Sequence, residues 1–145
     1  MAETFACSFK ATEQGARSCI SAVMQQLRDI DLPVNRAGDV QIALAEAVNN
    51  IVEHAYSDLS DGEIYIQCDL SPDELQICIS DTGPPLPNGE LPVGLPADIS
   101  GPMETLPEGG FGWHLIRALT CRLHYERQAD SNQLSLFFDM QAKQN

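Results

Sequence analysis

Three polar residues in one helix-like segment have the types and the spacing of a site for a cation and a proton. Glu46, Asn50 and His54 recur every four residues within the run Ala43–Tyr56, so in a helix they lie on one stripe. A carboxylate can accept a proton from a hydroxyl or a water, and an asparagine carbonyl oxygen suits Mg²⁺. Glu46 is therefore a candidate general base and Asn50 a candidate Mg²⁺ ligand, unless both are simply polar residues on an exposed helix face. His54 is more typical of a structural hydrogen-bonding residue.

A second candidate is the carboxylate of Asp81, where a strand-like apolar run ends in Asp-Thr-Gly. A carboxylate at a strand end can accept a hydrogen bond from the exocyclic amine of adenine. Gly83 would let the backbone approach the flat base, because no Cβ stands in the way. The alternative is an ordinary turn, in which Asp-x-Gly is common.

The third candidate is a glycine-rich segment, Gly109–Gly112, that opens a helical pattern. Free N–H groups at a helix start, together with glycines, can cradle phosphate groups, so Gly110 and Gly112 are candidate phosphate contacts. The segment does not follow a strand at the head of a βαβ unit, and a dinucleotide-binding fold is therefore a poor match. The glycines could also serve only the turn from loop to helix.

The elements that position these residues follow from hydrophobic periodicity and turn signals. The pattern predicts strands at 5–9, 64–70, 75–79, 123–127 and 134–138, and helices at 13–29, 35–56 and 111–120. Residues 84–109 contain seven prolines and lack periodicity, which is typical of a lid or binding loop. The predicted fold class is α/β: a two-layer α/β sandwich with helices on one face of a mixed, mostly antiparallel sheet, as a single domain over 1–145.

Composition narrows the classes of partner and compartment. The chain has 145 residues, of which 43% are hydrophobic, and a net charge of -13. Acidic surfaces repel phosphate backbones, so we expect no direct nucleic-acid binding and a basic protein partner instead.

We find no signal peptide and no apolar run of about 20 residues, so we expect a cytoplasmic protein that does not enter the membrane. The five cysteines include no C-x-x-C pair, and we expect reduced thiols rather than disulfides or metal ligands.

Taken together, the three segments resemble the motifs of the GHKL (Bergerat-type) ATPase superfamily. Glu46–Asn50 with His54–Tyr56 is similar to the first motif, Asp81–Pro85 to the second, and Gly109–Gly112 with Leu115–Arg117 to the third. Within the superfamily, the chain looks like the anti-sigma-factor serine/threonine kinases of bacterial partner-switching systems. No phosphoacceptor helix precedes the first strand, so we do not expect a complete sensor histidine kinase.

The resemblance implies which residues hold the substrate and the metal. ATP would bind with Mg²⁺ held at Asn50. Asp81 would receive the adenine amine and Gly83 would make room for the base. Gly110 and Gly112 would present backbone amides to the phosphates.

The resemblance also implies a function and partners. Glu46 would act as base toward a serine hydroxyl on a STAS-domain anti-anti-sigma factor. The same chain would hold a sigma factor inactive, and such proteins are typically homodimers. By family analogy, the edge strand near Phe5–Phe9 is the expected dimer interface.

One departure from the family supports a second reading. The segment 84–109 contains no Lys or Arg, whereas family kinases usually offer a basic residue near the γ-phosphate, where a cation can accelerate phosphoryl transfer by orders of magnitude. The alternative function is a nucleotide-dependent protein-binding regulator without significant kinase activity. Trp113, directly after Gly112, is expected to be a packing residue.

Overall fold

The computed structural model describes residues 3–30, 32–56, 62–83 and 110–140. The elements follow in the predicted order. They are β1 (Glu3–Lys10), α1 (Glu13–Asp29), α2 (Val34–Tyr56), β2 (Glu63–Leu70), β3 (Glu74–Asp81), α3 (Gly110–Leu119), β4 (Arg122–Gln128) and β5 (Ser131–Asp139). The predicted lid at 84–109 lies outside the described residues. The largest difference is in β5, which begins three residues before the predicted start at 134.

The strands form one sheet in the order β1-β2-β3-β5-β4, and every neighbouring pair is antiparallel. The expectation of a mixed sheet is therefore wrong for the described part of the chain. Two helices separate β1 from β2 and together return the chain to the sheet end where β1 stops, so Lys10 pairs with Glu63. Short turns join β2 to β3 and β4 to β5, and such hairpins are antiparallel by construction. β1 is an edge strand, as predicted.

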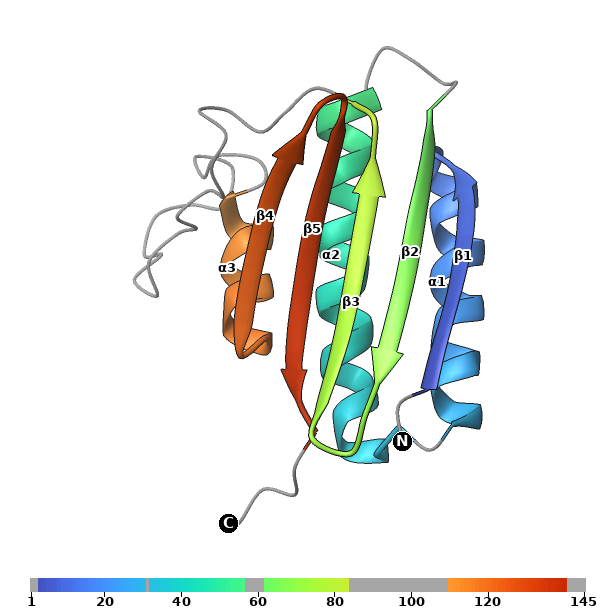
Figure 1. Cartoon of the computed structure of the whole chain (residues 1–145), viewed down its shortest axis with the longest axis vertical. Coiled ribbons are helices and arrows are strands. Elements are labelled where there is room, and N and C mark those ends of the chain that lie inside the picture. The colour runs from blue at the N-terminus through green and yellow to red at the C-terminus, as the bar shows by residue number, and fades with distance from the viewer. Residues whose placement is uncertain (1–2, 31, 57–61, 84–109, 141–145) are drawn as a thin grey trace.

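The helices cover one face of the sheet, as Figure 1 shows, and the core lies between the two layers. Residues of β2 and β3 alternate between a buried side that faces the helices and a more exposed side, whereas β5 is buried on both sides from Leu134 to Phe138. The buried apolar residues of these three strands that belong to the core cluster are Ile64, Ile66, Cys68, Leu70, Leu75, Ile77, Ile79, Leu134, Leu136 and Phe138. None of the helices in the described ranges is long and apolar enough to cross a membrane.

Helix α1 begins at a side-chain cap. The Thr12 hydroxyl accepts a hydrogen bond of 2.9 Å from the backbone N–H of Gly15, which satisfies one of the free donors at the helix start. Apolar residues then recur at helical spacing and point into the core: Ala16, Cys19, Ile20, Val23, Met24 and Leu27. This stripe fixes α1 against the sheet and against α2.

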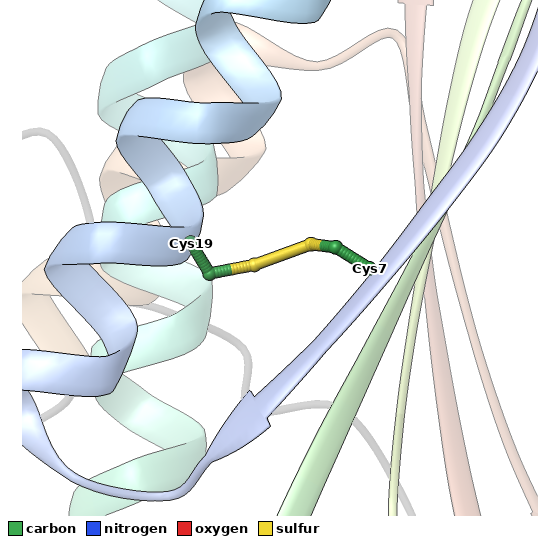
Figure 2. The surroundings of a disulfide bond; sticks show 2 residues. All are labelled: Cys7 and Cys19. Carbon is green, nitrogen blue, oxygen red and sulfur yellow. A yellow bond between two sulfur atoms is a disulfide. The ribbon is translucent and has the colours of Figure 1, made fainter.

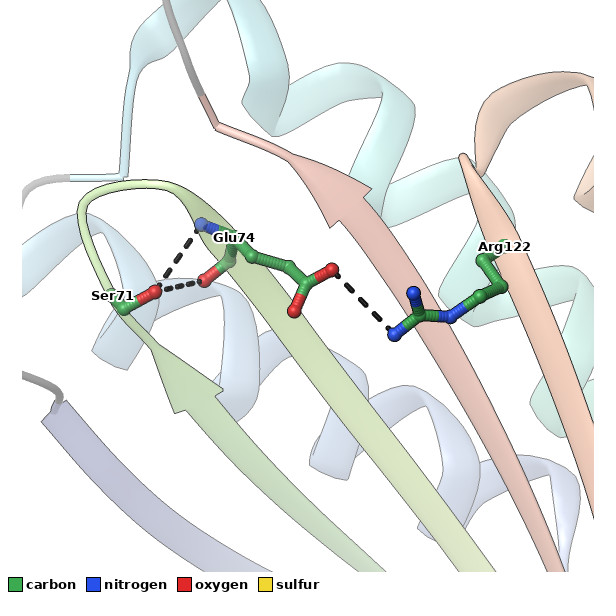
Figure 3. Close-up of polar contacts among 3 residues, drawn as sticks. All are labelled: Ser71, Glu74 and Arg122. Carbon is green, nitrogen blue, oxygen red and sulfur yellow. Dashed lines mark hydrogen bonds and ion pairs between the residues drawn. The ribbon is translucent and has the colours of Figure 1, made fainter.

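The turn between β2 and β3 and the outer face of the sheet are drawn in Figure 3. The Ser71 hydroxyl bonds both backbone groups of Glu74, at 3.0 Å to the carbonyl oxygen and 3.2 Å from the N–H. The Glu74 carboxylate forms a 3.8 Å ion pair with Arg122 of β4. The Arg122 guanidinium also lies 3.9 Å from the centre of the Phe137 ring, which it covers. These contacts hold the outer face and do not involve the candidate site.

The cysteines differ from the expectation of reduced thiols. Cys7 of β1 and Cys19 of α1 form a disulfide, shown in Figure 2, whereas Cys68, Cys78 and Cys121 are free. The physical reason is that Cys7 lies on the side of β1 that faces α1, while Cys19 lies on the buried stripe of that helix. Spacing in the sequence did not indicate this pairing, because it arises from how a strand and a helix pack.

Candidate nucleotide-binding site

Helix α2 positions the first pair of candidate residues. Its buried side is formed by Val40, Ala43, Leu44, Ala47 and Val48, none of which is exposed. This side fixes the rotation of the helix, so the stripe with Glu46 and Asn50 lies at the border of the core, and both residues are half-buried. The side chain of His54 lies outside the described part of the structure. A carboxylate and a carboxamide at such a border can reach a ligand while their helix remains packed.

Asn50 carries a buried polar atom without a partner. Its side-chain Nδ2 is shielded from solvent and has no hydrogen bond to any described residue. A buried amide that lacks a partner costs stability, and such an exception in a folded protein requires an explanation. Since the nitrogen and oxygen of an asparagine amide can exchange places by rotation, the group can serve a phosphate oxygen or a cation. Asn50 therefore remains a candidate ligand contact.

Asp81 is the last residue of β3 and continues the inward-facing series of Leu75, Ile77 and Ile79. It is only 5% exposed. Its Oδ1 accepts a hydrogen bond of 2.8 Å from the backbone N–H of Gly83, so the strand end is tied into a turn. The structure thus brings Asp81 and Gly83 together, as the sequence indicates, and buries the carboxylate at the edge of the core.

Asn132 of β5 completes the surroundings of Asp81. It lies directly opposite Asp81 in the antiparallel register and is also 5% exposed. Its Nδ2 donates to Asp81 Oδ1 at 3.0 Å and to the Gly83 carbonyl oxygen at 3.1 Å. One amide therefore holds both the carboxylate and the backbone that follows it.

Two residues of β4 hold Asn132 in turn. The Tyr125 hydroxyl donates to Asn132 Oδ1 at 2.6 Å. Arg127 donates to the same oxygen at 3.1 Å and to the Gly83 carbonyl oxygen at 2.7 Å. The buried polar groups at this end of the sheet are thus bonded to one another, which removes most of the cost of burying them.

Tyr125, Arg127 and Asn132 were not predicted from the sequence. The sequence does contain a signal for them, because residues two apart in a strand lie on the same face of the sheet. Asn132 shares a face with Leu134, and Tyr125 and Arg127 share one with Leu123. Extending the alternation to the strand ends would have placed three polar residues on the helix-facing side. The bonds from Arg127 and Asn132 to Asp81 and Gly83, however, depend on the pairing of β3 with β5, which the sequence did not reveal.

Helix α3 begins at Gly110, with Gly112 in its first turn, so both glycines occupy the predicted helix start. The side chains of Trp113 and Ile116 anchor α3 in the core, with exposed fractions of 5% and 0%. The prediction that Trp113 is a packing residue is confirmed. The helix packs on α2, the helix that carries Asn50. The free N–H groups of the first turn of α3 can donate hydrogen bonds to an anion.

The strand end that carries Asp81 and the helix start that carries Gly110 and Gly112 lie toward one end of the molecule. In Figure 1, α2 and β3 end and α3 begins toward the top of the view. Among the described residues, the hydrogen bonds join Asp81 and Gly83 to the β4–β5 pair, and none joins Asp81 to Glu46 or Asn50. The same residues contain no cluster of three or more His, Cys, Asp or Glu side chains that could hold a metal by itself. A cation here would therefore need oxygen atoms from its ligand as well as from Asn50.

Comparison with known families identifies the fold. A model described as "Histidine kinase-like ATPase domain" matches residues 9–138. The chain belongs to the histidine kinase-like ATPase family. This match confirms the predicted GHKL resemblance and spans all the strands and helices that surround the candidate site.

Known proteins support the same assignment. The chain is 46% identical over 83 residues to the serine-protein kinase RsbW of Bacillus cereus strain AH187, covering 56% of this chain and 51% of that protein. It is 45% identical over 83 residues to the serine-protein kinase RsbW of Bacillus mycoides strain KBAB4, with the same coverage. The chain thus spans about half the length of the curated relatives it matches.

Solved structures confirm the fold. The RsbU and RsbW domains of a Mycobacterium tuberculosis protein align with a TM-score of 0.64 at 20% identity, over 94% of this chain and 32% of that chain. The catalytic domain of the histidine kinase ThkA aligns with a TM-score of 0.54 at 17% identity, over 94% of this chain and 98% of that one. The two-layer α/β class with helices on one sheet face is therefore confirmed.

Proposed function

We propose that this chain is an anti-sigma factor and a serine/threonine protein kinase that uses Mg-ATP. It binds a sigma factor and phosphorylates a STAS-domain anti-anti-sigma factor on serine. The observation that carries the proposal is the buried carboxylate of Asp81 at the end of β3, held by donors from Gly83 and Asn132. A buried carboxylate with one oxygen already engaged is suited to accept the exocyclic amine of adenine with the other.

The residues present fit a magnesium nucleotide. The Asn50 Nδ2 is buried at the border of the core and has no partner among the described residues, and rotation of the amide would put its oxygen there instead. Gly110 and Gly112 lie in the first turn of α3, where backbone amides can bind phosphate oxygens. Mg²⁺ bound at Asn50 would neutralise charge on the phosphates of ATP. This local arrangement offsets the repulsion expected from a net charge of -13.

Glu46 is the proposed catalytic base. It precedes Asn50 by one turn of α2 and is half-buried. In the reaction, the serine oxygen attacks the γ-phosphorus and Glu46 takes the hydroxyl proton. The bond between the γ-phosphorus and the oxygen that bridges it to the β-phosphorus breaks. The products are phosphoserine and ADP. A general base typically contributes a factor of about 10² to 10⁴ to the rate.

The partners follow from the same family relationship. We propose that phosphorylation of the anti-anti-sigma factor keeps the sigma factor captured, and that the unphosphorylated form displaces it. The acidic surface suits a basic sigma-factor surface. A homodimer joined at β1, an edge strand of the described sheet, and a cytoplasmic location complete the proposal.

A second function is favoured by one specific observation. The segment 84–109 contains no Lys or Arg, although a cation near the γ-phosphate accelerates phosphoryl transfer. In this second proposal, the chain captures a regulator in a nucleotide-dependent manner and phosphorylates nothing. The two functions share the proposed adenine pocket, which is the site formed by Asp81 and Gly83, and they differ only in the role of Glu46.

The test is transfer of labelled phosphate from Mg-[γ-³²P]ATP to proteins of a native lysate, with mass spectrometry of the labelled products. Glu46→Gln is the test variant and Glu53→Gln is the matched control, since Glu53 is an exposed carboxylate on the same helix. We expect phosphoserine on a STAS-type protein with wild type and with the control, and a loss of at least about 100-fold with Glu46→Gln. A partner that binds only with Mg-ATP and is never phosphorylated would favour the second function. Absence of any nucleotide-dependent effect would contradict both.

A further inference from the structure

A row of polar side chains crosses three neighbouring strands at one end of the helix-facing side of the sheet. Asp81 of β3 lies opposite Asn132 of β5, and Asn132 lies opposite Arg127 of β4. The neighbouring inward positions on the same strands, such as Ile79 and Leu134, are buried and apolar. Polar groups in such positions are costly unless they are hydrogen-bonded. Because the residues of this row are hydrogen-bonded to one another, the row is a stable part of this end of the sheet.

The row holds two acceptors at the end of β3. Both hydrogen bonds that Asp81 accepts from described residues end on Oδ1, one from Gly83 N–H at 2.8 Å and one from Asn132 Nδ2 at 3.0 Å. The Gly83 carbonyl oxygen likewise takes two donors, Arg127 at 2.7 Å and Asn132 Nδ2 at 3.1 Å. The β4–β5 hairpin thus fixes both the carboxylate and the backbone that follows it, leaving Oδ2 of Asp81 for a ligand donor.

The direction of the Asn132 amide is fixed as well. Its Oδ1 takes donors from Tyr125 at 2.6 Å and from Arg127 at 3.1 Å. The Arg127 guanidinium cannot accept a hydrogen bond from the NH₂ group, so a rotated amide would lose the bond to Arg127 and would turn its oxygen toward the Asp81 carboxylate. Arg127 therefore acts on Asp81 in two ways, through the orientation of Asn132 and through the Gly83 carbonyl.

We propose that Arg127 and Asn132 are positioning residues that give the site its preference for adenine. They do so by holding Asp81 and Gly83 in the arrangement that accepts the exocyclic amine. This inference deepens the proposed function and rests on its adenine pocket. Neither residue is required to touch the phosphates. Their loss should therefore weaken recognition of the amine and leave the rest of the nucleotide contacts in place.

The first test compares Arg127→Gln with Arg122→Gln by calorimetry with Mg-ATP and with Mg-ITP, whose base lacks the amine. Arg122 is the matched control because it is an arginine of the same strand whose contacts lie on the outer face. Arg127→Gln should weaken Mg-ATP binding about tenfold, as expected for loss of a charged hydrogen bond, and change Mg-ITP binding less than about twofold. Arg122→Gln should leave both unchanged. Arg127→Lys, which keeps one charged donor, should recover part of the loss.

A second variant tests Asn132 without depending on Arg127. Asn132→Asp keeps the acceptor that faces Tyr125 and Arg127 but places a carboxylate against Asp81. At pH 8 the two carboxylates repel each other, whereas at pH 5.5 a shared proton restores a donor between them. The ratio of the variant to the wild-type dissociation constant for Mg-ATP should be about ten or more at pH 8 and should fall toward one at pH 5.5. Dividing by the wild-type value cancels the titration of the nucleotide itself.

The outcomes separate this inference from the proposed function. If Arg127→Gln and Asn132→Asp bind Mg-ATP as wild type does, or lose Mg-ATP and Mg-ITP equally, the positioning role is wrong. If wild type prefers Mg-ATP and Asp81→Asn removes that preference in the same experiment, the adenine pocket stands regardless of that result. If wild type binds neither nucleotide, the proposed function itself fails. Thermal unfolding of each variant establishes that a loss of binding is not a loss of fold.

Discussion

Asn132 lies opposite Asp81 across two antiparallel strands, and its amide donates a 3.0 Å hydrogen bond to the buried carboxylate. This relationship links the end of β3 to the β4–β5 hairpin, which lies about 50 residues further along the chain. It explains why a carboxylate that is only 5% exposed is tolerated there. The candidate adenine contact is therefore a property of three strands rather than of one short motif.

Asn50, whose Nδ2 has no partner in the described part of the chain, predicts a specific response to magnesium. Asn50→Ala should weaken ATP binding about tenfold in the presence of Mg²⁺, because a bound cation loses one oxygen ligand. When EDTA removes Mg²⁺, wild type and variant should bind ATP with similar affinity. The measurement is calorimetry with and without the metal, and Asn49→Ala is the control because Asn49 is an exposed neighbour on the same helix. An equal loss in both conditions would rule out a role toward the cation.

The disulfide between Cys7 and Cys19 predicts a count of thiols. Denatured without reductant, the protein should show three reactive thiols of its five cysteines, those of Cys68, Cys78 and Cys121. The measurement is titration with a thiol reagent in guanidinium. Since the bond closes a loop of 12 residues, reduction should lower the free energy of unfolding by roughly 3 kcal/mol. Five reactive thiols would show instead that the two cysteines are reduced, as the sequence analysis expected.

The buried thiol of Cys68 predicts a loss of stability at alkaline pH. Burial, and to a lesser degree the neighbouring carboxylate of Asp69, raises the pKa of this thiol from 9.0 to about 12. Above pH 9 the unfolded chain loses the thiol proton while the folded chain keeps it, so ionisation favours unfolding. The free energy of unfolding should therefore fall as the pH rises from 9 toward 12. In Cys68→Ala, urea denaturation between pH 8 and 10.5 should show a weaker fall; an identical fall would assign it to other groups.

Two helical glycines predict opposite effects on stability. A Cβ at Gly38 of α2 would meet nothing within 4 Å, so Gly38→Ala should raise the free energy of unfolding by about 0.5 to 1 kcal/mol. A Cβ at Gly15 of α1 would collide with the carbonyl oxygen of Lys10 and lie 3.1 Å from the capping oxygen of Thr12. Gly15→Ala should therefore destabilise the protein by about 1 to 3 kcal/mol. Urea denaturation measures both, and a stabilising Gly15→Ala would contradict the packing described for the β1–α1 turn.

Local patterns were enough to predict the order of the elements and their approximate bounds. The alternation in β2 and β3 identified a hairpin, and the spacing of Ile20, Val23, Met24 and Leu27 identified α1. Those signals are strong because each buried face repeats several times. The type of the sheet was partly wrong, since strand direction depends on how the helices return the chain rather than on any local period.

The candidate site was predictable only where its residues are contiguous in the sequence. Asp81 and Gly83 were found because they form one turn, and Gly110 and Gly112 because they open one helix. Asn132 and Arg127 were missed because their role depends on strand register. The disulfide was missed for the same reason, since Cys7 and Cys19 meet only when β1 packs on α1. Contacts between distant segments are not encoded in spacing.

The most direct test of the account is the affinity of wild type and Asp81→Asn for Mg-ATP and Mg-ITP. In the variant, the oxygen that accepts from Gly83 and Asn132 is kept, so the fold should persist, but the second oxygen becomes a donor that faces the adenine amine. We expect wild type to bind Mg-ATP in clear preference to Mg-ITP. We expect Asp81→Asn to lose about 10- to 100-fold in Mg-ATP affinity with little change for Mg-ITP. Unchanged Mg-ATP affinity in the folded variant would contradict the central claim that the end of β3 recognises adenine.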